Sequence, residues 1–70
     1  MNGDLREKLG KRIKEVRKSK DLTQKTLAEK CDTTTEYIYF IESGNKTPST
    51  EMYIKLSLAL DIPLDELFLI

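Results

Sequence analysis

Few side chains in this 70-residue chain have the chemistry for covalent catalysis or metal binding. The chain has no histidine and one cysteine, Cys31, which excludes most zinc sites and all histidine-based catalytic triads. Glu42 with Glu36 or Asp32 could be paired as carboxylates, but one small core leaves little room for a pocket that encloses a substrate. We therefore expect neither an enzyme nor a metal or cofactor site.

The more informative side chains lie between residues 24 and 41, where small, polar and apolar types follow a fixed spacing. Ala28 stands four residues after Gln24, and a small residue there allows two helices to cross closely. Asp32 stands where the turn between the helices needs a positive φ, which a short polar residue adopts at low cost. Ile38 and Ile41 then anchor a second helix through one face. This layout predicts a helix-turn-helix, whose second helix enters the DNA major groove.

Five helices with short connections must position these residues, and no strand pattern is present. The first helix, from residue 2 or 4 to about residue 18, carries an apolar stripe with helical spacing: Leu5, Leu9, Ile13 and Val16. The second helix begins after the N-cap Thr23 and ends near Cys31. The expected fold class is therefore all-α, with a single domain over residues 1–70 and the helix-turn-helix at about residues 23–43.

The later helices are marked by their caps and breaks. The third begins within residues 33–35 and ends at Gly44, which supplies a left-handed position after the helix. The fourth begins behind Ser49 or at Pro48, and its expected core stripe is Tyr53, Leu56 and Leu60. Pro63 opens a short fifth helix, whose first turn is acidic as the helix dipole favours.

Short motifs follow one another in a fixed order along most of the chain. They are Leu22-Thr23-Gln24 with Leu27-Ala28, Tyr37-Ile38 with Ile41-Glu42-Ser43-Gly44, Pro48-Ser49, and Leu60-Asp61-Ile62 with Leu64-Asp65-Glu66-Leu67. This ordered set resembles the Cro and phage-repressor-like helix-turn-helix family, often called the XRE family, over about residues 5–68. The resemblance implies a five-helix lambda-repressor-like DNA-binding domain, usually a homodimer on a two-fold symmetric operator.

The sequence departs from the family pattern at several positions. Asp32 stands where the family prefers glycine, and we expect about 1 kcal/mol of strain or less there. Thr33 replaces a usual aliphatic residue, which weakens the packing of the turn. Thr26 stands where a glutamate commonly completes a capping box, so that box is missing. Tyr39 and Phe40 replace small or polar residues on the recognition helix, and these two changes bear on which DNA sequence is bound.

One face of the third helix is expected to meet DNA bases. At 100° per residue, Glu36, Phe40 and Ser43 lie opposite the side of Ile38 and Ile41, and Tyr39 flanks them. The resemblance implies that bases are read by Thr35, Glu36 and Phe40, with Tyr39 on a base or the backbone. A glutamate can accept from cytosine N4, and a threonine or phenylalanine can pack on a thymine methyl.

Each of these assignments has a structural alternative. Glu36 would complete a capping box if Thr33 were the N-cap of the third helix. Phe40 could pack against the first helix or a loop, and Tyr39 could simply cover the helix surface.

Contacts with phosphates are expected from donors at helix starts and in the loop after the third helix. The resemblance places a backbone clamp at Gln24 and a hydroxyl contact at Tyr37. Lys25 is either a contact or a solvated charge, and Thr34 serves as a cap whose backbone amides can still hold a phosphate. The full expected set is Gln24, Lys25, Thr34, Tyr37, Ser43, Asn45 and Lys46.

Glu42 leans toward the core side of the third helix, which is unusual for a carboxylate. The resemblance pairs it with an arginine at the end of the first helix, here Arg17. We therefore expect a structural ion pair, Arg17–Glu42, that fixes the recognition helix.

The C-terminus carries more apolar side chains than so small a core can hold. Ile54 and Leu58 also point away from the core stripe of the fourth helix. Unsatisfied apolar surface of this kind marks a partner site, and the family dimer forms through this region, about residues 61–70. The expected interface residues are Leu64, Leu67, Phe68, Leu69 and Ile70; the alternative is that a missing segment covers them.

The formal charge of the chain is zero, with 12 basic and 12 acidic residues, which at first argues against a nucleic-acid partner. Residues 1–30 nevertheless hold ten Lys or Arg and five Asp or Glu, a net of +5, and residues 31–70 hold two and seven, a net of −5. Neutrality is thus a cancellation of two blocks, and the basic block covers the two helices that flank the groove.

The polar N-terminus has no signal peptide pattern, and no segment can span a membrane. We expect Cys31 to be buried as a small hydrophobe in a reducing, cytoplasmic compartment. The expected function is a sequence-specific transcriptional regulator, a repressor before an activator, that binds double-stranded DNA as a homodimer without a small-molecule substrate. The alternatives are a restriction–modification controller protein, or an antitoxin-like module whose main partner is a protein.

Overall fold

The structure, a computed structural model, describes residues 2–67 of the chain. These residues form five helices and no strand, so the all-α fold expected from the sequence is confirmed. The helices are α1 (Asn2–Ser19), α2 (Gln24–Lys30), α3 (Thr35–Glu42), α4 (Thr50–Leu60) and α5 (Leu64–Leu67).

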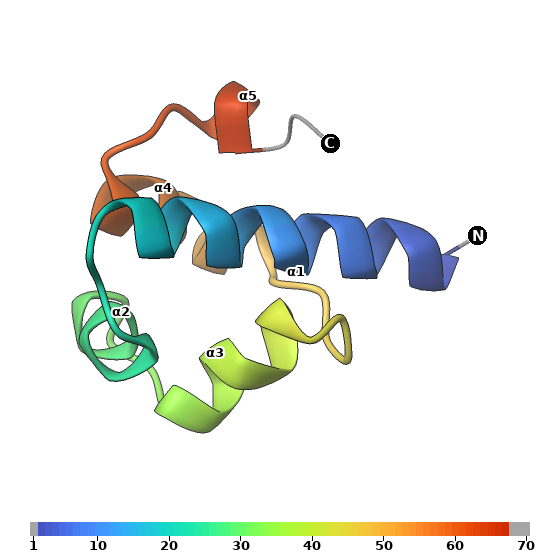
Figure 1. The fold of residues 1–70 in the computed structure, drawn as a ribbon, viewed down its shortest axis with the longest axis horizontal. Helices are drawn as coiled ribbons and strands as arrows, with labels where there is room; N and C mark the ends of the chain where they lie inside the picture. Colours follow the sequence, from blue (N-terminus) through green and yellow to red (C-terminus); the bar gives the residue numbers. More distant parts are fainter. Residues whose placement is uncertain (1, 68–70) are drawn as a thin grey trace.

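The long helix α1 is the axis around which the other helices are arranged. In Figure 1, α2 and α3 lie on one side of α1 and α5 lies on the other. Helix α3 packs against α1 and α2, and α4 packs against α2 and α5. One apolar core joins the five: Leu9, Ile13, Val16, Leu27, Ala28, Cys31, Ile38, Ile41, Tyr53, Leu56, Leu60 and Leu67. Burying each large aliphatic side chain contributes about 2 kcal/mol to the stability of the fold. Because Ile38 and Ile41 of α3 are buried in this core, they fix which face of α3 points outward.

Hydroxyl side chains begin three of the helices. Thr23, Thr34 and Ser49 are the N-caps of α2, α3 and α4, and each side chain accepts a hydrogen bond of 3.0 to 3.1 Å from the backbone N–H three residues later. Because Thr34 and not Thr33 caps α3, Glu36 is not the third helical residue. The capping-box alternative for Glu36 is therefore wrong, and its carboxylate contributes to the start of α3 only as an acidic group in the first turn.

Four helices end with a residue in the left-handed region. The positive φ angles are 58° at Asp21, 56° at Asp32 and 54° at Asp61, with 83° at Gly44. At each end, the N–H of that residue and the next N–H return to carbonyls of the last helical turn, which is the Schellman arrangement. The expected positive φ at Asp32 and Gly44 is confirmed, and two further aspartates share it.

A glycine inside α1 allows α3 to come close. A Cβ atom built on Gly10 would lie 2.3 Å from the carbonyl oxygen of Ile41 and 2.7 Å from that of Glu42. These are backbone atoms, so no side-chain rotation relieves the overlap. Gly10 therefore sets the distance between α1 and the end of α3, a role that was expected only of Ala28, between α2 and α3.

The C-terminal helix corrects one expectation. Leu67 is fully buried within a single chain, so it belongs to the core and offers no surface to a partner. Helix α5 is also attached to α1 through Arg12, whose Nη2 donates to the carbonyl of Glu66 at 3.1 Å. Phe68, Leu69 and Ile70 lie outside the described residues. Among the described helices, none has the length and apolar character to cross a membrane.

Candidate nucleic-acid interface

The face of α3 that points away from the core carries the side chains expected to read bases. Ile38 and Ile41 are buried, and Thr35 and Glu36 are exposed in the first turn. Tyr39 is 53% exposed. The structure therefore leaves these side chains free to meet a partner, and their contacts with bases remain predictions.

Phe40 is half-buried and belongs to an aromatic cluster around a lysine. The Nζ of Lys46 lies 5.6 Å from the ring centroid of Phe40 and 5.8 Å from that of Tyr37. The ring of Tyr39 lies 5.8 Å from that of Phe40, tilted by 57°. Cation–π contacts of this kind contribute about 0.5–1 kcal/mol at exposed sites. The cluster holds the Lys46 ammonium beside the outward face of α3. A phosphate there could take the place of one aromatic ring as the partner of the ammonium.

The loop after α3 is ordered by its own side chains. The Ser43 hydroxyl donates to the carbonyl of Phe40 at 3.2 Å and accepts from Asn45 Nδ2 at 3.1 Å. Its hydrogen is thus already engaged, and a phosphate contact through Ser43 would require the hydroxyl to rotate. Asn45 and Lys46 are exposed and stay the stronger candidates in this loop.

At the start of the helix-turn-helix, the residues expected to bind phosphate differ in their exposure and in their hydrogen bonds. Lys25 is exposed and Tyr37 is half-buried. Thr34 accepts the N–H of Tyr37, which leaves its hydroxyl hydrogen available. Thr23 donates its hydroxyl hydrogen to the Thr26 hydroxyl at 2.9 Å, so Thr26 stabilises the cap where a capping-box glutamate is absent.

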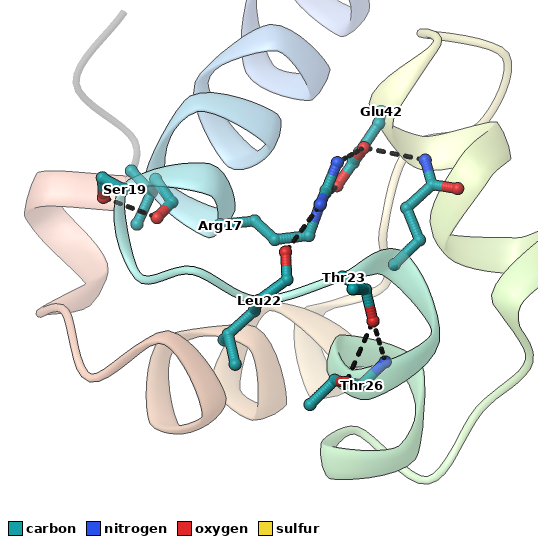
Figure 2. A network of polar contacts seen from close by, with 8 residues as sticks. Arg17, Ser19, Leu22, Thr23, Thr26 and Glu42 are labelled. Carbon is teal, nitrogen blue, oxygen red and sulfur yellow. Dashed lines mark hydrogen bonds and ion pairs between the residues drawn. The ribbon is translucent and has the colours of Figure 1, made fainter.

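A buried ion pair ties α3 to the end of α1. Arg17 Nε donates to Glu42 Oε2 at 2.7 Å and Arg17 Nη2 donates to Glu42 Oε1 at 3.1 Å, as Figure 2 shows. Arg17 Nη1 also donates to the carbonyl of Leu22 at 2.7 Å. Both side chains are buried, at 8% exposure for Arg17 and 2% for Glu42. The pair expected from the resemblance is present, and its bidentate geometry fixes the angle of α3.

Gln24 has a second role that sequence reasoning missed. Its Nε2 donates to Glu42 Oε1 at 3.0 Å, so the side chain joins the first turn of α2 to the ion pair. One hydrogen of its amide remains for the expected phosphate contact. No signal in the spacing could reveal this bond, because the two residues lie 18 positions apart and meet only once α2 and α3 cross.

The single cysteine lies in the core and outside this interface. Cys31 is the C-cap of α2 and is fully buried. Burial raises the pKa of its thiol above the ordinary value of 9.0, and the charge of Lys55 opposes that shift to a smaller extent. Cys31 is therefore a packing residue and not a reactive thiol.

With two crossing helices, a left-handed turn and an exposed face on the second helix, the geometry is that of a helix-turn-helix. Residues 13–67 match the family model described as "Helix-turn-helix". The chain belongs to this family, in its Cro/C1-type branch. It is a DNA-binding transcriptional regulator.

Individual relatives match almost the whole chain. The chain is 36% identical over 66 residues to the control protein C.MunI of a Mycoplasma species. This match covers 93% of this chain and 89% of the relative. The crystal structure of the restriction-modification controller protein C.AhdI from Aeromonas hydrophila superposes with a TM-score of 0.89 at 38% identity, over 94% of each chain. The clp gene regulator ClgR from Corynebacterium glutamicum superposes with a TM-score of 0.87 at 30% identity, over 90% of this chain and 67% of that chain.

Proposed function

We propose that this chain is a controller of restriction–modification genes, which acts in the cytoplasm and carries out no catalysis. The observation that carries the proposal is the end-to-end likeness to a restriction-modification controller, 94% of each chain at 38% identity. A second relative matched over nearly its whole length is also named a control protein. Of the alternatives weighed on the sequence, this one has a specific observation in its favour.

We propose that α3 enters the major groove and divides the work between two sets of side chains. The N-terminal residues of a recognition helix reach base edges, which assigns base reading to Thr35 and Glu36, and Tyr39 and Phe40 follow one turn later on the same helix. Phosphate contacts then fall to Gln24, Lys25, Thr34, Tyr37, Ser43, Asn45 and Lys46. All of these are exposed or half-buried around the outward side of the helix-turn-helix, which supports the proposal.

We propose that the operator is two-fold symmetric because two chains associate through α4 and α5. Ile54 is 45% exposed and Leu58 is 76% exposed, one turn apart on the same face of α4. Leu64 on α5 is exposed as well. Exposed aliphatic side chains grouped on adjacent helices favour a partner surface. A dimer through this surface would place two α3 helices about 34 Å apart, one turn of DNA.

A gel shift with DNA from upstream of the chain's own gene tests the function. The protein should retard that DNA, and the logarithm of the binding constant should fall linearly with the logarithm of salt concentration. The slope should be about 0.9 per phosphate contacted. DNA of shuffled sequence is the control. Equal binding of both DNAs, or none at low salt, would refute the proposal.

The division of roles has its own test. Gln24→Ala should weaken binding to all sequences by a similar factor, and Glu36→Ala should change which sequence is preferred. Because Gln24 also bonds Glu42, the unfolding midpoint of each variant must be measured and binding compared only where the protein is folded. If both variants lose affinity uniformly, the assignment of Glu36 to base reading is wrong.

A further inference from the structure

Glu36 is an unusual side chain to find on a surface that meets DNA. It occupies the second position of α3, is exposed, and forms no hydrogen bond or ion pair with any residue between 5 and 67. Its exposed neighbours on α3, Thr35 and Tyr39, carry no charge to neutralise it. An ionised carboxylate only accepts hydrogen bonds. Whatever this group binds must therefore present a donor.

The major groove offers few such donors. Guanine presents two acceptors there, and thymine presents one acceptor and a methyl group. Only cytosine N4 and adenine N6 carry hydrogens that can be donated in a hydrogen bond. Each of these exocyclic amines has two hydrogens, and one of them is used in Watson–Crick pairing. A single hydrogen per amine therefore remains for Glu36.

We propose that this chain senses methylation of an exocyclic amine in its operator, through Glu36. The inference depends on the proposed function, because it requires α3 to lie in the major groove. In N4-methylcytosine or N6-methyladenine within a duplex, the methyl group takes the place of the hydrogen that faces the groove. The carboxylate then meets a methyl group and has no donor left at that base.

The loss of affinity on methylation is larger for a carboxylate than for a neutral acceptor. Glu36 would sit between phosphates of like charge, and a desolvated charge without a partner is strongly unfavourable. A good base contact discriminates by about tenfold or more. We expect amine methylation in one half-site to weaken binding by at least about tenfold, and methylation in both half-sites to weaken it further.

Methylation at a different atom supplies a chemical control. In 5-methylcytosine the amine keeps both hydrogens, and the added methyl group lies where Tyr39 and Phe40 can pack against it. This modification should leave binding unchanged or strengthen it. The pair of modified cytosines therefore separates the amine contact from a general effect of added bulk.

The test begins with selection of the preferred duplex from random DNA by the purified protein. Duplexes of that sequence are then made with one N6-methyladenine, N4-methylcytosine or 5-methylcytosine at each possible position, and binding is measured by fluorescence anisotropy. The protein, Glu36→Ala and Glu36→Gln are compared. Glu29→Ala removes an exposed carboxylate from α2 and is the matched control.

The proposal predicts one amine position per half-site at which methylation weakens DNA binding by the protein, and by the Glu29→Ala variant, by at least about tenfold. Glu36→Ala should lose this sensitivity, and Glu36→Gln, which keeps an acceptor oxygen, should retain it. The proposal is overturned if no amine methylation weakens binding, or if Glu36→Ala stays as sensitive as the protein itself. Failure to select any sequence would instead refute the proposed function.

Discussion

Glu42 is the side chain on which the position of the recognition helix depends most directly. Its two oxygens accept from Arg17 and Gln24, so three helices meet at one carboxylate. Arg17 is held in turn by the carbonyl of Leu22. A buried pair satisfied this completely is tolerated in a small core, and loss of one member leaves the other charged and unpaired.

Glu42→Ala should therefore destabilise the protein strongly. The guanidinium of Arg17 would stay buried without its carboxylate, and removal of one partner of a buried pair costs about 3–5 kcal/mol. Urea unfolding followed by circular dichroism measures this loss. The double variant Arg17→Met with Glu42→Leu is the control, because it removes both charges and should be less destabilised than either single change. Equal losses in single and double variants would show that packing, and not the unpaired charge, dominates.

Cys31 should make stability fall at alkaline pH. In the unfolded chain its thiol ionises near the ordinary value of 9.0, whereas burial keeps it protonated to higher pH in the folded chain. The unfolded state therefore binds fewer protons above this pH, and the free energy of unfolding decreases as pH rises. Below about pH 8 the contribution is fully present.

Urea unfolding of the protein and Cys31→Ala from pH 7 to pH 10, in the presence of a reductant, measures this effect. Cys31→Ala should be less stable at pH 7, because it leaves a small cavity, and its stability should decline less steeply with pH. Tyr53→Phe is the comparison, since burial also raises the pKa of that phenol from 10.0. Its influence should begin at higher pH than that of Cys31. Parallel declines for the protein and Cys31→Ala would contradict this account.

At the scale of the helices, four helix ends share a left-handed residue, and three of these residues are not the most favourable type for that position. Three of the four left-handed residues are aspartates, although glycine and asparagine are the usual choices. An aspartate also places a negative charge at the negative end of the helix dipole. Each such end is therefore less stable than it could be, and the end at Asp32 lies in the turn of the DNA-binding motif.

Asp32→Asn should stabilise the protein by about 0.5 kcal/mol, because it keeps a residue tolerant of positive φ and removes the charge at the end of α2. Asp32→Gly should also be neutral or stabilising. Asp32→Ala should destabilise by about 1 kcal/mol, since alanine has no side-chain polarity to offset the left-handed backbone. Thermal unfolding midpoints of the three variants give the order. A stabilising Asp32→Ala would show that the charge alone matters.

The same helices show how far the sequence could be read. Caps such as Thr23 and Ser49, and the apolar stripes, have local signatures, so the five helices were predictable. Gly10 was missed because its reason lies in the backbone of α3, 31 positions away. Leu67 was misassigned because a helix of four residues has no periodicity that separates core from surface. The bond from Gln24 to Glu42 needed the crossing of α2 and α3 in space.

At the scale of the whole molecule, zero net charge conceals an electric asymmetry. The excess of basic residues belongs to α1 and α2, and most of the acidic excess follows in the later helices. We expect the field of DNA to draw the basic helices α1 and α2 toward the phosphates and to repel the acidic first turn of α5. In that orientation, the proposed partner surface around Leu58 would stay accessible while α3 is bound.

Leu58→Glu should therefore convert the protein to a monomer and weaken operator binding. The change places a charge in the centre of the proposed partner surface, and it should hardly affect folding because the side chain is 76% exposed in one chain. Analytical ultracentrifugation gives the association state. Leu5→Glu is the matched control, since that leucine is also exposed, at 56%, but lies on α1.

Binding data then connect the surface to the operator. A dimer occupies two half-sites with one association event, so its affinity gains from the second site by effective concentration. The monomeric Leu58→Glu variant should lose that gain and bind a full operator hardly better than a half-site, with about half the salt slope of the protein. The Leu5→Glu variant should remain dimeric and keep both the affinity and the slope. If Leu58→Glu stays dimeric, the two chains associate through another surface, and the spacing of the two α3 helices must be derived from that surface instead.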